Sequence, residues 1–130
     1  MTRETSRSGD SAMGNLVRAL TSAFAQMEEL ARHAVWHPPA DVYRTPDGWL
    51  IKLDLAGVRP EDVHLSVSGR HLTVKGMRRD WTVSQECRCY QMEIAYSQFE
   101  RQITLPVDLD NAEVQAEHHH GMLVVRIHQE

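Results

Sequence analysis

The hydrophobic pattern of this chain changes its period at Pro38-Pro39, and that change limits what the chain can fold into. Before the prolines, apolar residues recur at alternating spacings of four and three, as on one face of a helix. After them, apolar and polar residues alternate with a period of two, as in half-buried strands. The sequence therefore predicts a helical arm over residues 1–39 and an all-β domain over residues 40–130.

The N-terminal arm is predicted to form one amphipathic helix over residues 11–36, after a polar and disordered start at residues 1–10. Asp10 or Ser11 is suited to cap this helix, because its side-chain oxygen accepts from free backbone N–H groups. The prolines end the helix, because proline disfavours helical geometry in the residue before it. Ten apolar side chains form one face: Met13, Leu16, Val17, Leu20, Ala23, Phe24, Met27, Leu30, Ala31 and Ala34.

The second part is predicted to be an antiparallel, immunoglobulin-like β-sandwich of seven or eight strands, because short alternating segments are separated by turn signals. Turn residues stand at Thr45-Pro46-Asp47-Gly48, at Gly69-Arg70 and at His120-Gly121. The pattern is lost between Met77 and Arg88. The alternating segments lie near residues 42–44, 49–55, 63–68, 72–74, 90–96, 99–105, 114–118 and 123–127.

Composition and charge exclude several classes of function. The net charge is −4, and the basic residues are spread along the chain, unlike the clustered positive charge of a nucleic-acid surface. No apolar stretch approaches the roughly 20 residues that span a bilayer, and the polar N-terminus has no signal-peptide core. Two cysteines do not make a disulfide scaffold, so a reducing, cytoplasmic location is expected.

The motifs give little support to an enzymatic function. The seven glycines are isolated and form no phosphate-binding loop, and no serine lies in a G-x-S-x-G turn. The acidic pairs Glu28-Glu29 and Glu61-Asp62 fit a helix surface and a loop. We therefore expect a protein without catalytic residues and without a cofactor.

Four motifs in the second part resemble, in the same order, those of the small heat-shock protein (α-crystallin domain) family of bacterial and plant type. Together they cover residues 41–127, about two-thirds of the chain. Ala56 departs from the family pattern, which usually has proline at this place. The motifs are Asp54-Leu55-Ala56-Gly57-Val58-Arg59-Pro60-Glu61-Asp62-Val63, Leu72-Thr73-Val74-Lys75-Gly76, Phe99-Glu100-Arg101 with Leu105-Pro106, and Ala116 with Gly121-Met122-Leu123-Val124-Val125.

The resemblance implies an ATP-independent holdase chaperone, which binds partly unfolded client proteins and prevents their aggregation by mass action. Flexible faces that contain methionine suit such promiscuous binding. A helix that packs on its own domain, or that pairs as a coiled coil, explains the same face equally well. The client-binding residues of the arm would be Met13, Leu16, Val17, Leu20, Phe24, Met27 and Leu30.

The resemblance also implies a homodimer formed by strand exchange. The excursion at residues 77–88 matches the loop that carries an extra strand into the partner's sheet in bacterial- and plant-type members. Both chains gain from such a donation, because an unpaired strand edge is left with free hydrogen-bonding groups. Trp81 and Val83 would anchor this loop. Arg101 would lie at the dimer interface and pair with a carboxylate, and a solvated position at a sheet edge is the alternative.

In the family, an apolar groove receives an Ile-x-Ile motif from the tail of a neighbouring dimer. Here that groove would lie between residues 63–68 and 112–118. Val125-Arg126-Ile127 is predicted to be strand, so we expect no such tail. We therefore expect the chain to form dimers or small oligomers, or its groove to be filled by another small heat-shock protein or by the chain's own arm. The residues lining the groove would be Val63, Leu65, Val67, Val114 and Ala116.

Other functions remain open at this point. A partner-specific adaptor or co-chaperone of the CS-domain type would use the same sandwich, and so would a subunit that works only together with a second small heat-shock protein. His118 and His120 would share a strand face about 7 Å apart and are weak metal-ligand candidates, although zinc needs further ligands and a solvated turn explains them better. Cys87 and Cys89 border the exchange loop, so an intersubunit disulfide or redox sensing is the alternative to ordinary side chains.

Overall fold

The structure is a computed structural model that describes residues 2–129, with the side chains of residues 2–11, 28, 31 and 32 left out of the description. The predicted cap at Asp10 or Ser11 and the side chain of Ala31 in the predicted stripe therefore lie outside the described part. The elements, in chain order, are α1 (Thr2–His33), β1 (Ala40–Thr45), β2 (Gly48–Asp54), the 3₁₀ turn η1 (Pro60–Asp62), β3 (Val63–Ser68), β4 (His71–Met77), β5 (Gln98–Thr104), β6 (Glu113–His119) and β7 (Met122–His128).

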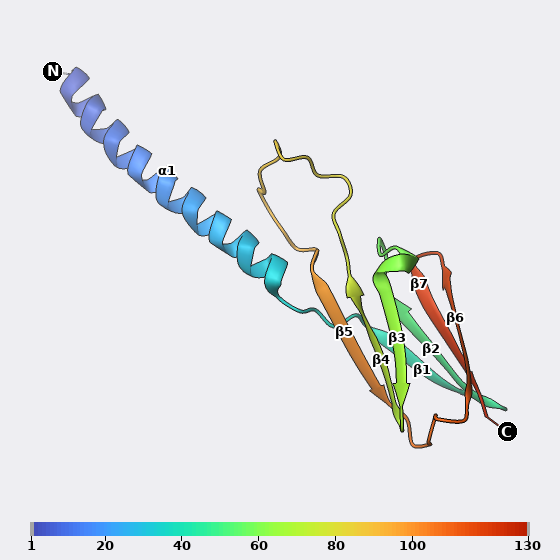
Figure 1. Cartoon of the computed structure of the whole chain (residues 1–130). Coiled ribbons are helices and arrows are strands. Elements are labelled where there is room, and N and C mark those ends of the chain that lie inside the picture. The colour runs from blue at the N-terminus through green and yellow to red at the C-terminus, as the bar shows by residue number, and fades with distance from the viewer. Residues whose placement is uncertain (1, 130) are drawn as a thin grey trace.

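The strands form two antiparallel sheets that lie face to face, and Figure 1 shows the smaller sheet in front of the larger one. The larger sheet has the order β1-β2-β7-β6, and the smaller sheet has the order β3-β4-β5. This arrangement confirms the predicted all-β sandwich with one N-terminal helix. The edges of the two sheets are therefore β1 and β6 in one layer and β3 and β5 in the other.

The core lies between the two sheets and is built by the alternation seen in the sequence. In the larger sheet, Leu53 pairs with Leu123 and Ile51 pairs with Val125, and the side chains of all four are buried. Each such side chain contributes about 1.5–3 kcal/mol by leaving water. The buried hydrophobic residues are Ile51, Leu53, Leu55, Val58, Leu72, Val74, Phe99, Ile103, Leu105, Leu109, Leu123, Val125 and Ile127.

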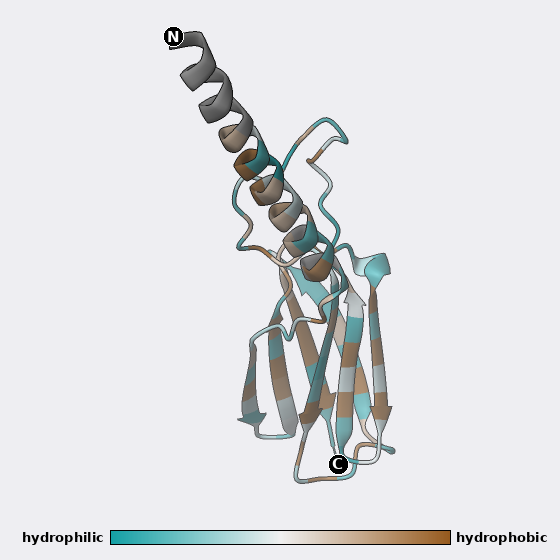
Figure 2. Ribbon diagram, turned by 90° about the vertical axis from the view of Figure 1, so that its left-hand side faces the viewer, coloured by the Kyte–Doolittle hydropathy of each residue, from teal (hydrophilic) through white to brown (hydrophobic). Residues whose placement is uncertain are grey.

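The helix α1 extends away from the sandwich as a separate arm (Figures 1 and 2). It ends at His33, three residues before the predicted end, because the following residues pair with a strand. The Trp36 N–H donates to the Gln98 carbonyl at 3.1 Å, and the Trp36 carbonyl accepts from the Glu100 N–H at 3.1 Å. A short parallel bridge to β5 thus stops the helix before the prolines are reached.

Two sequence expectations about regular structure differ from the fold. The helix includes residues 2–10, which were expected to be disordered, because no proline separates them from the helix that follows. Residues 90–96 were expected to form a strand, yet the whole segment 78–97 has neither helix nor strand. A strand needs a neighbour to pair with, and the edges available within this chain are not beside this segment in Figure 1.

Candidate interaction surfaces

The apolar face of α1 is exposed along its described length. Phe24 is 49% exposed and Leu30 is 72% exposed, and the other members of this face lie between these values. The side of the helix around Arg18 is polar, since the Arg18 guanidinium donates to Asn15 Oδ1 at 2.9 Å. In Figure 2, hydrophobic residues recur along the helix, which stands clear of the sheets. The exposed members are Met13, Leu16, Val17, Leu20, Phe24, Met27 and Leu30.

A second exposed apolar surface lies on the loop between β4 and β5. The predicted bounds of 77–88 were too short, because Met77 belongs to β4 and the irregular segment runs over residues 78–97, which we call the exchange loop from here on. Tyr90 is 93% exposed, and Trp81 and Ile94 are each about half exposed. In Figure 1 this loop extends from the same end of the sandwich as the helix does. The exposed large apolar residues of the loop are Trp81, Val83, Tyr90, Met92 and Ile94.

Arg78 fixes the base of the exchange loop. Its backbone N–H donates to the Ser97 carbonyl at 3.0 Å, and its guanidinium Nε donates to the Ala95 carbonyl at 2.7 Å. The guanidinium also lies 4.1 Å from the centre of the Trp36 ring, a cation–π contact. Arg78 therefore ties together the two ends of the loop and the segment that follows α1, a role that its place in the sequence does not indicate.

Trp81, a predicted interface residue, contacts its own chain. The guanidinium of Arg59 lies over its ring at 3.3 Å from the centre. Next to it, Arg79 forms an ion pair with Asp62 at 3.4 Å. These two contacts bring the first half of the loop against the segment before β3, while half of the Trp81 side chain remains exposed.

Arg101 lies on the inner face of β5, between the buried side chains of Phe99 and Ile103 and opposite Val74 on β4. Its side chain is partly buried. It has no hydrogen bond or ion pair with any other residue that the structure describes. The placement on an inner face agrees with the alternation in the sequence. No described residue supplies a carboxylate for Arg101, so a carboxylate that pairs with it would have to come from elsewhere.

The strands predicted to border the groove are edge strands of different sheets. β3 is the edge of the smaller sheet, β6 is the edge of the larger one, and in Figure 1 β3 is the strand of its sheet nearest to β6. The structure places the side chain of Ala116 in solvent, unlike the other four groove residues. Those four are partly buried and pack against the core: Val63, Leu65, Val67 and Val114.

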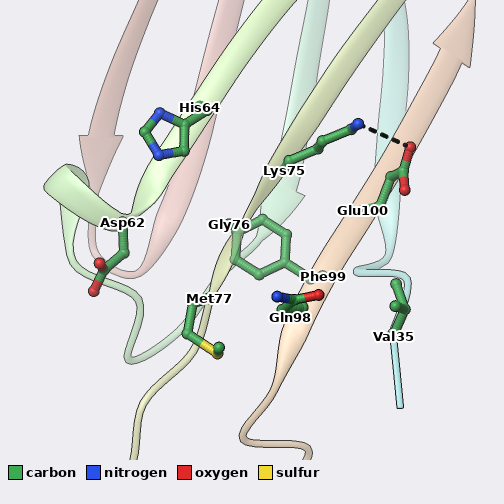
Figure 3. A pocket seen from close by; sticks show the side chains of 9 residues that line it. All are labelled: Val35, Asp62, His64, Lys75, Gly76, Met77, Gln98, Phe99 and Glu100. Carbon is green, nitrogen blue, oxygen red and sulfur yellow. Dashed lines mark ion pairs between the residues drawn. The ribbon is translucent and has the colours of Figure 1, made fainter. Parts of the chain in front are cut away.

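A cavity of about 390 Å³ opens on the sheet near the end of α1 (Figure 3). Lys75 and Glu100 form an ion pair across its rim at 3.8 Å. The Phe99 ring lies against Gly76, where a Cβ atom would collide with this ring and with the Asp62 carbonyl. The cavity is a feature that the strand pattern did not reveal, because it is formed by the end of the arm, η1 and three strands. Its lining residues are Val35, Asp62, His64, Lys75, Gly76, Met77, Gln98, Phe99 and Glu100.

The histidine run does not have the strand geometry that was expected of it. His118 belongs to β6, whereas His120 lies in the following turn with φ of 50°, so the two do not share one strand face. The ring of His120 instead packs edge-on against His119 with centres 4.1 Å apart. Nε2 of His118 is buried without a hydrogen bond. Among the described residues, no three His, Cys, Asp or Glu side chains are grouped to hold a metal ion.

The last strand is joined to the first turn of the sandwich by a titratable pair. His128 Nδ1 lies 2.8 Å from Asp47 Oδ2, and the Gln129 N–H donates to the Asp47 carbonyl at 2.8 Å. The hydrogen bond to His128 lowers the pKa of the Asp47 carboxyl below its ordinary value. Both side chains are well exposed, so this pair has a local effect.

The chain matches the model of the Hsp20/alpha crystallin family over residues 41–130. It is 31% identical to the 18 kDa heat shock protein of Streptomyces albus G over 103 residues, which cover 76% of this chain and 72% of that protein. It is 30% identical to spore protein SP21 of Stigmatella aurantiaca over 109 residues, covering 76% of this chain and 64% of the relative. Heat shock protein 16.0 from Schizosaccharomyces pombe has a TM-score of 0.65 at 27% identity, covering 72% of this chain and 87% of the other.

The fold, the four motifs and these matches agree, and the chain belongs to the Hsp20/alpha crystallin family. The chain is thus a small heat shock protein with an α-crystallin domain, of a family whose members act as chaperones. It spans about three fifths of the length of several curated relatives that it matches. Within the described residues, no helix combines the length and the hydropathy needed to cross a bilayer.

Proposed function

We propose that this chain is an ATP-independent holdase that captures partly unfolded proteins on the apolar face of α1. One observation carries the proposal: seven large apolar side chains lie along one side of a helix outside the sandwich, each at least 49% exposed. Contiguous exposed apolar surface of this kind marks sites of interaction. The family relation supports a chaperone role in general, and the exposed face indicates where a client would bind.

The physical basis of capture is the burial of apolar surface from both molecules. Each square ångström of apolar surface removed from water contributes about 25 cal/mol. Phe24 and the methionines of the face adapt to clients of different shape, because their side chains are large and, for methionine, flexible. Binding to an unfolded chain lowers the concentration that is free to associate with other unfolded chains. This mechanism requires no nucleotide and no change to the covalent structure of the client.

We further propose that two chains exchange the segment 90–96 of the exchange loop to form a homodimer. The alternating residues of this segment lie unpaired in the single chain, with Tyr90 and Ile94 exposed. β1 is an edge strand whose residues Val42 and Tyr43 are also exposed. If the segment pairs with β1 of the other chain, the unpaired backbone N–H and C=O groups of both form hydrogen bonds. Trp81, Val83 and Arg101 then belong to the dimer interface.

The groove between β3 and β6 is proposed as a second binding site. Val63, Leu65, Val67 and Val114 are only partly buried there, so an apolar segment that covers them gains further burial. The occupant that fits is an extended segment with alternating aliphatic residues, from a second small heat-shock protein or from the arm. A cytoplasmic location also stays a prediction from the cysteine content.

The holdase proposal is tested by light scattering from a heat-destabilised client without ATP. One variant carries Leu16→Ser, Leu20→Ser and Phe24→Ser on the apolar face. A matched control carries Asn15→Ser, Ala19→Ser and Gln26→Ser, three exposed positions on the other side of the same helix. The parent and the control are expected to suppress scattering, and the apolar-face variant is expected to lose most of this activity.

The control separates loss of apolar surface from loss of helix, because both variants introduce three serines into α1. Circular dichroism of the two variants checks that their helix content is equal. Equal suppression by both variants would assign capture to another surface, and the absence of suppression by the parent would refute the holdase function.

A further inference from the structure

The exchange loop contains both cysteines of the chain. Cys87 is exposed and Cys89 is partly buried, and neither is in a disulfide. Both line one cavity of about 760 Å³, together with apolar side chains of the loop such as Met92 and Ile94. The two thiols are therefore close in sequence, share one cavity and are reachable from solvent through Cys87.

Ser84 contacts both the thiol and the backbone of Cys87. Its hydroxyl lies 3.5 Å from the Cys87 sulfur, and the Cys87 N–H donates to the Ser84 carbonyl at 3.1 Å, which closes a turn. Hydrogen bonds to the sulfur from the Ser84 side chain, and from its backbone, lower the pKa of the Cys87 thiol, whereas burial and Asp80 act in the opposite direction. The thiolate is the form of cysteine that attacks electrophiles. Its greater exposure makes Cys87 the more accessible of the two thiols.

The spacing of the two cysteines permits a direct bond between them. Two residues of extended chain span about 6.6 Å, which is within the 4.4–6.8 Å between Cα atoms that a disulfide accepts. The chain from residue 87 to residue 89 is irregular, so no sheet hydrogen bonds resist a small closure. A disulfide near the upper limit of this separation is strained, and strained, exposed disulfides are the ones that are easily reduced.

We propose that Cys87 is a peroxide-reactive thiol and that Cys89 of the same chain resolves it into a reversible disulfide. This site is independent of the proposed holdase function, since its chemistry takes place on the protein alone.

The first step consumes one hydrogen peroxide molecule. The Cys87 thiolate sulfur attacks one peroxide oxygen, so that an S–O bond forms and the O–O bond breaks. The leaving hydroxide takes a proton and becomes water, and the sulfur becomes a sulfenic acid. In the second step the Cys89 sulfur attacks the Cys87 sulfur, the S–S bond forms and the S–O bond breaks. The second oxygen leaves as water, so two thiols lose two electrons and the peroxide gains them.

The first test treats the reduced full-length chain with hydrogen peroxide and dimedone, which traps sulfenic acids. The parent is expected to lose the mass of two hydrogen atoms, with the bond mapped to the peptide that contains residues 87–89, and dithiothreitol is expected to reverse this change. Cys89→Ser is expected to accumulate one dimedone adduct at Cys87. Cys87→Ser is expected to remain unmodified under the same conditions.

The contribution of the turn is tested with Ser84→Ala, against Thr82→Ala as the matched control. The Thr82 hydroxyl lies in the same loop and bonds to Asp80, and no contact joins it to Cys87. The charged residues around the cavity are Asp80, Arg88 and Glu93, and all are retained in both variants. Ser84→Ala is expected to shift the pH profile of the Cys87 reaction upward and to slow the reaction at pH 7. Thr82→Ala is expected to leave both nearly unchanged, because the backbone N–H of residue 82 still donates to Asp80.

Several results would overturn the proposal. Adducts that form on Cys89 as fast as on Cys87 would remove the distinction between the two thiols. A disulfide found only between chains on a non-reducing gel would remove the role of Cys89 in the same chain. An unchanged pH profile in Ser84→Ala would remove Ser84 as the cause of the reactivity.

Discussion

The sandwich and the arm use the same kinds of side chain for opposite purposes. Phe99, in the sandwich, is 2% exposed and packs on the Trp36 ring, with the ring centres 5.4 Å apart. Phe24, in the arm, is 49% exposed. In the sandwich, two sheets provide an inner face for every second residue of a strand. In the arm, a single helix has an apolar face and no neighbour to cover it, so its apolar surface is available for binding.

The largest expected effect comes from removing one phenylalanine from each region. Phe99→Ala is expected to lower the free energy of unfolding by about 3–5 kcal/mol, since it leaves a cavity in the core. Phe24→Ala is expected to change the same quantity by less than about 0.5 kcal/mol. Urea denaturation followed by circular dichroism measures both. Similar losses in the two variants would mean that the arm packs like a core.

Arg101 tests whether the sandwich also buries a side chain against a second chain, at the proposed dimer interface. In the proposed dimer, Arg101→Ala leaves a carboxylate unpaired at the interface, which costs about 3–5 kcal/mol. The dissociation constant measured by sedimentation is expected to rise roughly 10²- to 10⁴-fold. Gln102→Ala, an exposed neighbour on β5, is the control and is expected to have little effect. Equal dissociation constants for the two variants would place Arg101 outside the interface.

Two glycines provide a smaller contrast between the regions. Gly76→Ala is expected to lower the free energy of unfolding by about 1–3 kcal/mol, because the new Cβ collides with Phe99 and the Asp62 carbonyl. Gly14→Ala is expected to stabilise α1 by up to about 1 kcal/mol, because its Cβ meets only the end of the Arg18 side chain at 3.9 Å. Thermal unfolding and helix content measure these effects. A neutral Gly76→Ala would show that β4 and η1 separate easily.

The smallest expected effect is the pH dependence of the pair formed by Asp47 and His128. Because the folded pKa of Asp47 is lowered, its contribution to stability is present above its unfolded pKa, near 4, and is lost as the pH falls through the folded pKa. His128→Ala is expected to raise the pKa of Asp47 toward its ordinary value. Titration of the carboxyl signal by NMR measures this shift. An unchanged pKa would show that the pair does not persist in solution.

The sequence was sufficient to predict the sandwich because its strands are paired within one chain. Ile51 and Leu53 are two residues apart, as are Leu123 and Val125, and this spacing directly encodes which side of each strand faces the core. The face of α1 was predicted for the same reason, since the spacing of Leu20 and Phe24 depends only on the geometry of the helix.

The features that could not be predicted depend on contacts between distant segments or on another chain. Arg78 contacts Trp36 and Ala95, and neither contact leaves a local pattern. The alternation in residues 90–96 predicted a strand that the structure does not have, because a strand forms only where a pairing edge exists. The turn that places Ser84 beside Cys87 also arises from loop geometry rather than from a period.

Site-specific photo-cross-linking to a heat-destabilised client tests the central claim most directly. A photoreactive amino acid is placed in turn at Leu20 and Phe24 on the apolar face of α1, at Gln26 on its polar side, and at Ser66 on the exposed face of β3. Strong cross-links to the client at Leu20 and Phe24, with weak ones at Gln26 and Ser66, are the predicted result. Cross-links of equal strength at all four positions, or the strongest at Ser66, would contradict the assignment of client capture to the arm.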